Sequence, residues 1–104
     1  MAGTKATNLE KIMSILKEHK AELKERYGAR EIGIFGSYVR GEYKEKSDLD
    51  ILVEFEEDAK IGLLKFVNLE NYLSDLIGFK VDLVEKSALK PRIGKNILRE
   101  VITL

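Results

Sequence analysis

The chain has 104 residues, of which 44% are hydrophobic and 35% charged, as in a folded globular protein with one modest core. Lys and Arg number 18, as do Asp and Glu, and this balance argues against a general nucleic-acid coat or a membrane-surface binder. The lack of cysteine excludes disulfides, thiolate zinc sites and cysteine nucleophiles. No signal peptide or bilayer-spanning stretch is found, so we expect one cytoplasmic domain over residues 1–104.

The N-terminal quarter of the sequence predicts one amphipathic helix. The run Thr7-Asn8-Leu9-Glu10 has the form of a capping box, in which threonine and glutamate satisfy each other's free amides. Gly28 is a natural stop for this helix. The apolar residues that recur at helical spacing are Leu9, Ile12, Met13, Leu16 and Leu23.

Three β-prone runs follow, at residues 31–35, 49–55 and 80–84. Between the first two we expect a short helix from residue 37 to about residue 43, because Gly36-Ser37 provides a tight turn and a serine N-cap. A longer helix over residues 61–77 ends at Gly78, and Pro91 fits the first turn of a final helix. The apolar stripes of these two helices are Leu63, Phe66, Val67, Leu73, Leu76 and Ile77, and then Ile93, Ile97 and Val101. These elements predict an α/β fold, a single sheet with helices packed on it.

Two aspartates stand at the start of the second strand. Because side chains alternate along a strand, Asp48 and Asp50 point to the same face, with α-carbons roughly 6.5–7 Å apart. Such a pair can bind one divalent cation, or two held about 3.5–4 Å apart. Carboxylate ligands with no histidine or cysteine nearby favour Mg²⁺ or Mn²⁺ over zinc.

A third acid, Asp82, interrupts the otherwise apolar third strand, where a lone buried carboxylate would be unfavourable. A neighbouring metal ion would relieve that cost, and so would an ion pair with Lys80 or Lys86. If the second and third strands are adjacent, the three carboxylates meet on one face of the sheet.

The turn before the short helix has features of a phosphate site. Free backbone amides at Gly36-Ser37 suit a phosphate, and Arg40 lies on the same side of that helix, within reach of either phosphates or aspartates. Two better-known motifs fail here. Glu42 stands where a P-loop needs lysine, and Val53 stands where an EF-hand starting at Asp48 needs glycine.

A Gly-Ser turn, a short helix, Asp-x-Asp on the next strand and a third acid on a later strand form the signature of the DNA polymerase beta-like nucleotidyltransferases. The run GSYVRGEYKEKSDLDILV resembles the minimal nucleotidyltransferases (MNT) of that superfamily. These single-domain proteins are often paired with a HEPN-family protein in prokaryotic toxin–antitoxin modules. The similarity extends from Glu31 through the KVDLVEK stretch to the C-terminal segment.

The resemblance implies a polymerase beta-like fold and a role for each motif residue. It assigns Gly36 and Ser37 to the triphosphate of the nucleotide, with Arg40 in the same signature. It makes Asp48 and Asp50 metal ligands. The third carboxylate, Asp82, would bind metal or deprotonate the attacking hydroxyl.

The function that the resemblance implies is a Mg²⁺- or Mn²⁺-dependent transfer of AMP from ATP to a hydroxyl, with a tyrosine of a HEPN toxin as the favoured acceptor. The chain would then be an antitoxin. Larger members carry an added helical domain that this sequence lacks, so base and acceptor selectivity must come from a partner or from a second subunit. Two alternatives stay open, an antitoxin that neutralises its partner by binding alone and a transferase for a small molecule such as an aminoglycoside.

Overall fold

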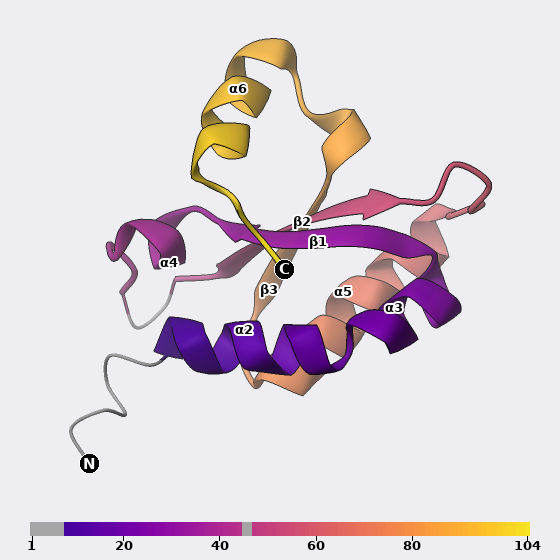
Figure 1. The fold of residues 1–104 in the computed structure, drawn as a ribbon, viewed down its shortest axis with the longest axis horizontal. Helices are drawn as coiled ribbons and strands as arrows, with labels where there is room; N and C mark the ends of the chain where they lie inside the picture. Colours follow the sequence, from indigo (N-terminus) through magenta and orange to yellow (C-terminus); the bar gives the residue numbers. More distant parts are fainter. Residues whose placement is uncertain (1–7, 45–46) are drawn as a thin grey trace.

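A computed structural model describes residues 8–44 and 47–104, which form one four-stranded mixed sheet with helices on both faces (Figure 1). The expected single mixed sheet is therefore confirmed. The predicted capping residue Thr7 lies outside the described residues. No helix in the described ranges is long and apolar enough to cross a membrane.

The N-terminal helical region consists of two helices, α2 (Asn8–Glu18) and α3 (Lys20–Tyr27), where the sequence predicted one. The interruption is at His19, which has φ −100° and ψ 5° and whose Nδ1 lies 2.8 Å from the carbonyl oxygen of Ile15. The predicted end at Gly28 is confirmed. Gly28 has a left-handed backbone, and its N–H donates to the carbonyl of Lys24.

Strands β1 (Ala29–Phe35), β2 (Leu49–Phe55) and β3 (Val81–Glu85) begin and end within two residues of their predicted positions. A fourth strand, β4 (Ile102–Thr103), was not predicted, because two residues carry no alternating pattern. The strand order is β3-β2-β1-β4. β2 runs parallel to β3 and antiparallel to β1, and β4 is antiparallel to β1.

The connecting helices are α4 (Ser37–Arg40), α5 (Leu63–Ile77), the 3₁₀ turn η1 (Lys86–Ala88) and α6 (Pro91–Glu100). α4 is shorter than expected because Gly41 ends it in a left-handed conformation. Ser37 was predicted as its N-cap, but Gly36 holds that position with no side-chain cap and Ser37 is the first helical residue.

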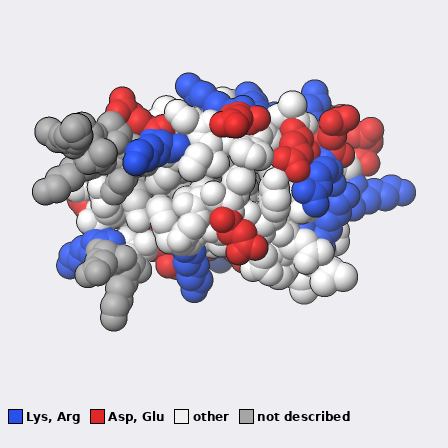
Figure 2. All heavy atoms as spheres, turned by 90° about the horizontal axis from the view of Figure 1, so that it is seen from below, with Lys and Arg blue, Asp and Glu red and all other residues white. Residues whose placement is uncertain are grey.

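The main core lies between the sheet and the layer of α2, α3 and α5 (Figure 1). Its fully buried side chains include Leu16, Leu23, Ile34, Leu49, Ile51, Val53, Leu69 and Leu73. The predicted inner stripe of α5 is wrong in its N-terminal part, because Leu63 is 80% exposed beside an open groove between α5 and β3 and Val67 is 38% exposed. Figure 2 views this helical layer from below. Charged side chains gather at the end where α3 and the loop after β2 lie.

Helix α6 lies alone on the opposite face of the sheet (Figure 1). Of its ten residues only Gly94 is buried, and Ile93, expected to pack inward, is 57% exposed. A cavity of about 40 Å³ remains between α6 and the sheet, bordered by Leu52, Leu98 and Val101. This layer is packed less completely than the other.

Candidate active site

The two central carboxylates come from neighbouring parallel strands. In the β2–β3 ladder Asp50 is the direct partner of Asp82, and Asp48 immediately precedes β2. Leu49 and Ile51, on either side of Asp50, are fully buried in the main core, so Asp50 faces the α6 side of the sheet. The structure thus brings the predicted acids to one end and one face of the sheet.

The pKa of Asp50 is well above that of an ordinary aspartate. Burial, together with the negative charges of Asp82 and Asp48, raises the pKa of Asp50 from its ordinary 3.8 to about 6. The positive charge of Arg40 opposes this rise. An ionised Asp50 is therefore unfavourable without added positive charge, which is the behaviour expected of a cation ligand.

Asp82 is exposed, so the expectation that it is a buried lone carboxylate is wrong. The strand is at the edge of the sheet and only its inward side chains, such as Val81 and Leu83, are covered. The alternative of a lysine partner is not realised in the described residues either. Lys80 lies 3.9 Å from Asp48, and Lys86 lies 3.5 Å from Glu54.

Gly36 joins β1 to α4 directly beside Asp50. Its φ is 84° and its ψ is −152°, and a Cβ atom at this position would overlap Oδ2 of Asp50. The sequence suggested that this glycine lets a phosphate approach the backbone. In the structure the group that approaches it most closely from the sheet is the carboxylate of Asp50.

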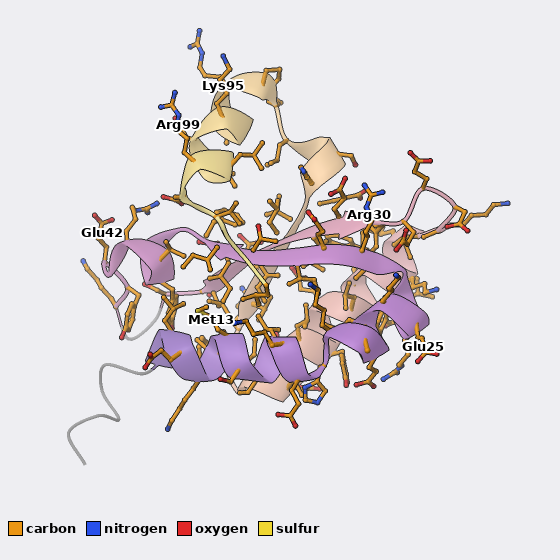
Figure 3. The ribbon with its side chains drawn as sticks, in the orientation of Figure 1. Met13, Glu25, Arg30, Glu42, Lys95 and Arg99 are labelled. Carbon is orange, nitrogen blue, oxygen red and sulfur yellow. The ribbon has the colours of Figure 1, made fainter. Side chains whose placement is uncertain are left out.

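The Gly36 amide and Arg40 share a partner that the sequence analysis missed, Glu100. The N–H of Gly36 donates to Oε2 of Glu100 at 2.7 Å, and Nη1 of Arg40 lies 3.0 Å from each Glu100 oxygen. Nε of Arg40 donates to Glu42 at 2.8 Å. Glu100 is the last residue of α6, and Figure 3 shows Glu42, which follows α4, on the side of the molecule where α6 ends near Arg99.

Arg40 therefore pairs with two glutamates, and the hypothesis of a structural ion pair with a motif aspartate is not realised. The only signal for Glu100 in the sequence is a single acid at the end of a basic helix that carries Arg92, Lys95 and Arg99. Figure 3 shows Lys95 and Arg99 pointing away from the sheet. Such a pattern is ordinary for a solvated helix, so it could not identify the contact.

Aromatic packing fixes the position of α4. The ring of Tyr38 stacks on Tyr43 with centroids 4.3 Å apart, and on Phe79 at 5.5 Å. Phe79 stands just before β3, so the stack ties α4 to the strand that carries Asp82. This places the Gly36–Arg40 segment beside the carboxylates.

The oxygen ligands of this site match a hard divalent cation. Asp48, Asp50 and Asp82 offer only carboxylates, which suit Mg²⁺ or Mn²⁺. In the described part of the chain, no three Asp, Glu or His side chains already stand as a metal-binding group. Asp50 and Asp82 are direct partners in the β2–β3 ladder, and Asp48 is two residues before Asp50.

Comparisons with known proteins show the family to which the chain belongs. The family model described as "Nucleotidyltransferase domain" matches residues 16–104. A Thermococcus cleftensis protein named protein adenylyltransferase MntA is 64% identical over 94 residues, covering 90% of this chain and 93% of that protein. A solved structure assigned to the minimal nucleotidyltransferases superposes with a TM-score of 0.71 at 40% identity, covering 89% of this chain and 95% of the other.

A more distant solved structure shares the fold. It is described as a tri-AMPylated Shewanella oneidensis HEPN toxin in complex with MNT antitoxin. The TM-score is 0.58 at 20% identity, with 92% of this chain and 67% of that chain covered.

Proposed function

This chain belongs to the minimal nucleotidyltransferases, and we propose that it transfers AMP from ATP to a tyrosine hydroxyl of a HEPN-family toxin, thereby acting as its antitoxin. The observation that carries the proposal is the pairing of Asp50 with Asp82 across β2 and β3, with Gly36 packed against Asp50. This arrangement puts acids and a backbone turn suited to phosphate in one place.

In the proposed reaction the acceptor oxygen forms a bond to the α-phosphorus of ATP while the bond to the β-phosphate breaks. Pyrophosphate leaves with the bonding electrons, and the acceptor proton passes to a carboxylate oxygen of Asp82. Asp82 is exposed, which leaves it open to a hydroxyl carried by another protein. Mg²⁺ or Mn²⁺ held by Asp48, Asp50 and Asp82 would supply positive charge to the attacking and leaving oxygens.

The triphosphate would bind at the turn after β1. The Gly36 N–H and the Arg40 guanidinium both donate to an anionic oxygen in the structure, that of Glu100, so both groups are directed at one anion position. Ser37, the first residue of α4, would add its hydroxyl. Arg40 would balance the charge of the leaving pyrophosphate.

The nucleotide, the acceptor and the partner in this proposal rest on relatives. A protein that is 64% identical is named as a protein adenylyltransferase, which supports AMP as the transferred group. A fold neighbour is a complex of an AMPylated HEPN toxin with an MNT antitoxin, which supports a HEPN protein as acceptor. Tyrosine as the acceptor residue follows from the family resemblance.

The proposal is tested by incubating the purified protein with Mg²⁺, ATP labelled in its α-phosphate and the HEPN protein encoded by a neighbouring gene. We expect label on a tyrosine of the partner, located by mass spectrometry. The double change Asp48→Asn and Asp50→Asn should abolish labelling, whereas Asp58→Asn, in the loop after β2, should not. A folded wild-type protein that leaves the partner unlabelled would contradict the proposal.

The same variants separate catalysis from neutralisation by binding. If AMP transfer is the antitoxin activity, cells that express the toxin should not be rescued by the Asp48→Asn, Asp50→Asn protein. Rescue by this variant would show that binding alone is sufficient. Labelling of an aminoglycoside instead of the partner would identify a small-molecule transferase.

A further inference from the structure

The carboxylate of Glu100 binds the groups that the proposed function assigns to the triphosphate. Its Oε2 accepts from the Gly36 N–H at 2.7 Å, and both oxygens lie 3.0 Å from Nη1 of Arg40. The Glu100 side chain is 24% exposed and its contact with the Gly36 amide is partly buried, whereas the Arg40 side chain is 47% exposed. A carboxylate and a phosphate oxygen have the same charge sign and the same need for N–H donors, so they compete for these two donors.

The end of the chain holds Glu100 in this position. Directly after Glu100, Val101 lies so close to Gly33 of β1 that a Cβ there would be 2.6 Å from Cγ2 of Val101. Ile102 and Thr103 then pair with Ile34 and Gly33 as strand β4. Because β4 begins opposite Ile34, near the end of β1, Glu100 lies beside the Gly36 turn.

Helix α6, which ends at Glu100, buries little of its surface against the sheet. α6 buries only Gly94, its first half exposes Ile93, and a cavity of about 40 Å³ separates it from the sheet. β4 is two residues long. A small displacement of α6 or a new rotamer of Glu100 would free the Gly36 amide and Arg40 without disturbing the main core on the other face.

We infer that Glu100 is a positioning residue of the nucleotide site, which holds the Gly36 N–H and Arg40 when no triphosphate is bound and lowers the affinity for triphosphate. The inference rests on the proposed function, since it takes these donors to be triphosphate ligands. Every binding event must first displace the carboxylate, so the measured dissociation constant equals the intrinsic one divided by the fraction of protein in which the donors are free. Glu100 thereby sets the nucleotide concentration at which the protein becomes loaded.

The test uses Glu100→Gln, which keeps the shape of the side chain and removes its charge. Binding is measured by calorimetry with Mg²⁺ and α,β-methylene-ATP, an analogue whose α–β linkage does not transfer AMP. We expect roughly tenfold or greater tightening, because the neutral amide competes poorly for Arg40. In the transfer assay the same change should lower the KM for ATP. The fold-change in kcat should be smaller than the fold-change in KM.

The matched control is Glu42→Gln. Glu42 accepts from Nε of the same arginine at 2.8 Å but makes no contact with the Gly36 amide. The Glu42→Gln change also removes one negative charge near the site, but it leaves the Gly36 amide bound to Glu100. The affinity for the analogue should therefore rise much less than with Glu100→Gln. In an Arg40→Gln background the effect of Glu100→Gln should shrink, because one of the two contested donors is gone.

The outcomes distinguish this inference from the proposed function. Wild-type protein that binds the analogue as tightly as Glu100→Gln, or more tightly, overturns the inference and leaves the proposed function standing, since Glu100 would then be neutral or would support the site. Equal tightening by Glu42→Gln and Glu100→Gln also overturns it. If none of the folded proteins binds the analogue, the Gly36–Arg40 turn is not a triphosphate site and both proposals fail.

Discussion

Gly36 and Asp50 fit together only because residue 36 has no side chain. A Cβ atom on Gly36 would overlap Oδ2 of Asp50, and the backbone of Gly36, with φ 84° and ψ −152°, is in a region that other residues rarely adopt. Gly36 follows β1 and precedes α4, whereas Asp50 is on β2. One close approach thus sets the position of the central carboxylate relative to the turn assigned to phosphate.

Gly36→Ala should therefore damage both stability and activity. The backbone conformation alone should cost about 1–3 kcal/mol of unfolding free energy. The added methyl group should also push Asp50 out of line with Asp82, so AMP transfer should fall to background. Urea unfolding and the labelling assay measure the two effects separately.

Gly41→Ala is the control for that change. Gly41 also has a positive φ, 72°, but a Cβ there meets nothing within 4 Å. Its cost should be the backbone strain alone, about 1–2 kcal/mol, and Asp50 should stay in place. If the two variants lose transfer activity equally, the Gly36–Asp50 contact is not what positions the carboxylate.

The raised pKa of Asp50 predicts a pH dependence of stability in metal-free buffer. The folded protein binds the Asp50 proton more tightly than the unfolded chain, with a pKa of about 6 against 3.8. Stability should therefore fall as pH rises from about 4 to 6 and level off above that. The charges that act on Asp50 are Asp48, just before β2, Asp82 on β3, Arg40 on α4 and Glu100 on α6.

Asp50→Asn should remove this contribution and make the protein more stable than wild type above pH 6. The measurement is the difference in unfolding free energy between the two proteins from pH 4 to pH 8, with EDTA present. This difference should change between pH 4 and 6 and be constant above pH 7. A difference that is independent of pH would mean that Asp50 is not held in its acid form by burial and by Asp82.

Much of this architecture was accessible from the sequence because local signals were strong. Gly28 and Gly78 end helices in the left-handed conformation, and the alternation around Asp50 defines β2 to the residue. The adjacency of β2 and β3, which brings Asp82 to Asp50, was only a condition in the sequence analysis, and the structure shows that it is met. Periodicity and turn chemistry are properties of neighbouring residues, so they can be recognised from the sequence alone.

The features that were missed depend on contacts between distant segments. Glu100 is 64 residues from Gly36, and nothing near either position indicates that they meet. The exposure of Asp82 depends on β3 being an edge strand, and the two-residue β4 is held by pairing with β1. Each of these features depends on tertiary packing, which no local sequence pattern indicates.

The inner face of α5 offers a direct test of one such correction. Leu73 is fully buried in the main core, whereas Leu63, on the same helix, is 80% exposed. Leu73→Ala should lower the unfolding free energy by about 2–5 kcal/mol, and Leu63→Ala should change it by less than about 0.5 kcal/mol. Denaturant unfolding of both variants decides this, and similar losses would mean that the first turn of α5 is packed after all.

The last prediction concerns whether Asp48, Asp50 and Asp82 act as one cation site. Metal and nucleotide that bind only the folded protein must stabilise it, by roughly 2.7 kcal/mol at a free concentration one hundred times the dissociation constant. Calorimetric melts of wild type with Mn²⁺ and ATP should show this increase. Because Asp82 is exposed, Asp82→Ala should leave the metal-free melting temperature unchanged or raise it only slightly.

The same Asp82→Ala change should sharply reduce the gain from Mn²⁺ and ATP, because a ligand and its charge are lost on the strand next to Asp50. Asp58→Ala removes an exposed acid from the loop after β2 and should keep the full gain, which controls for net charge. If Asp82→Ala gains as much as wild type, the three carboxylates do not share a cation. If Mn²⁺ and ATP leave the melting temperature of the wild type unchanged, the acids at this end of the sheet do not bind metal-bound ATP. The proposed reaction would then have no site here.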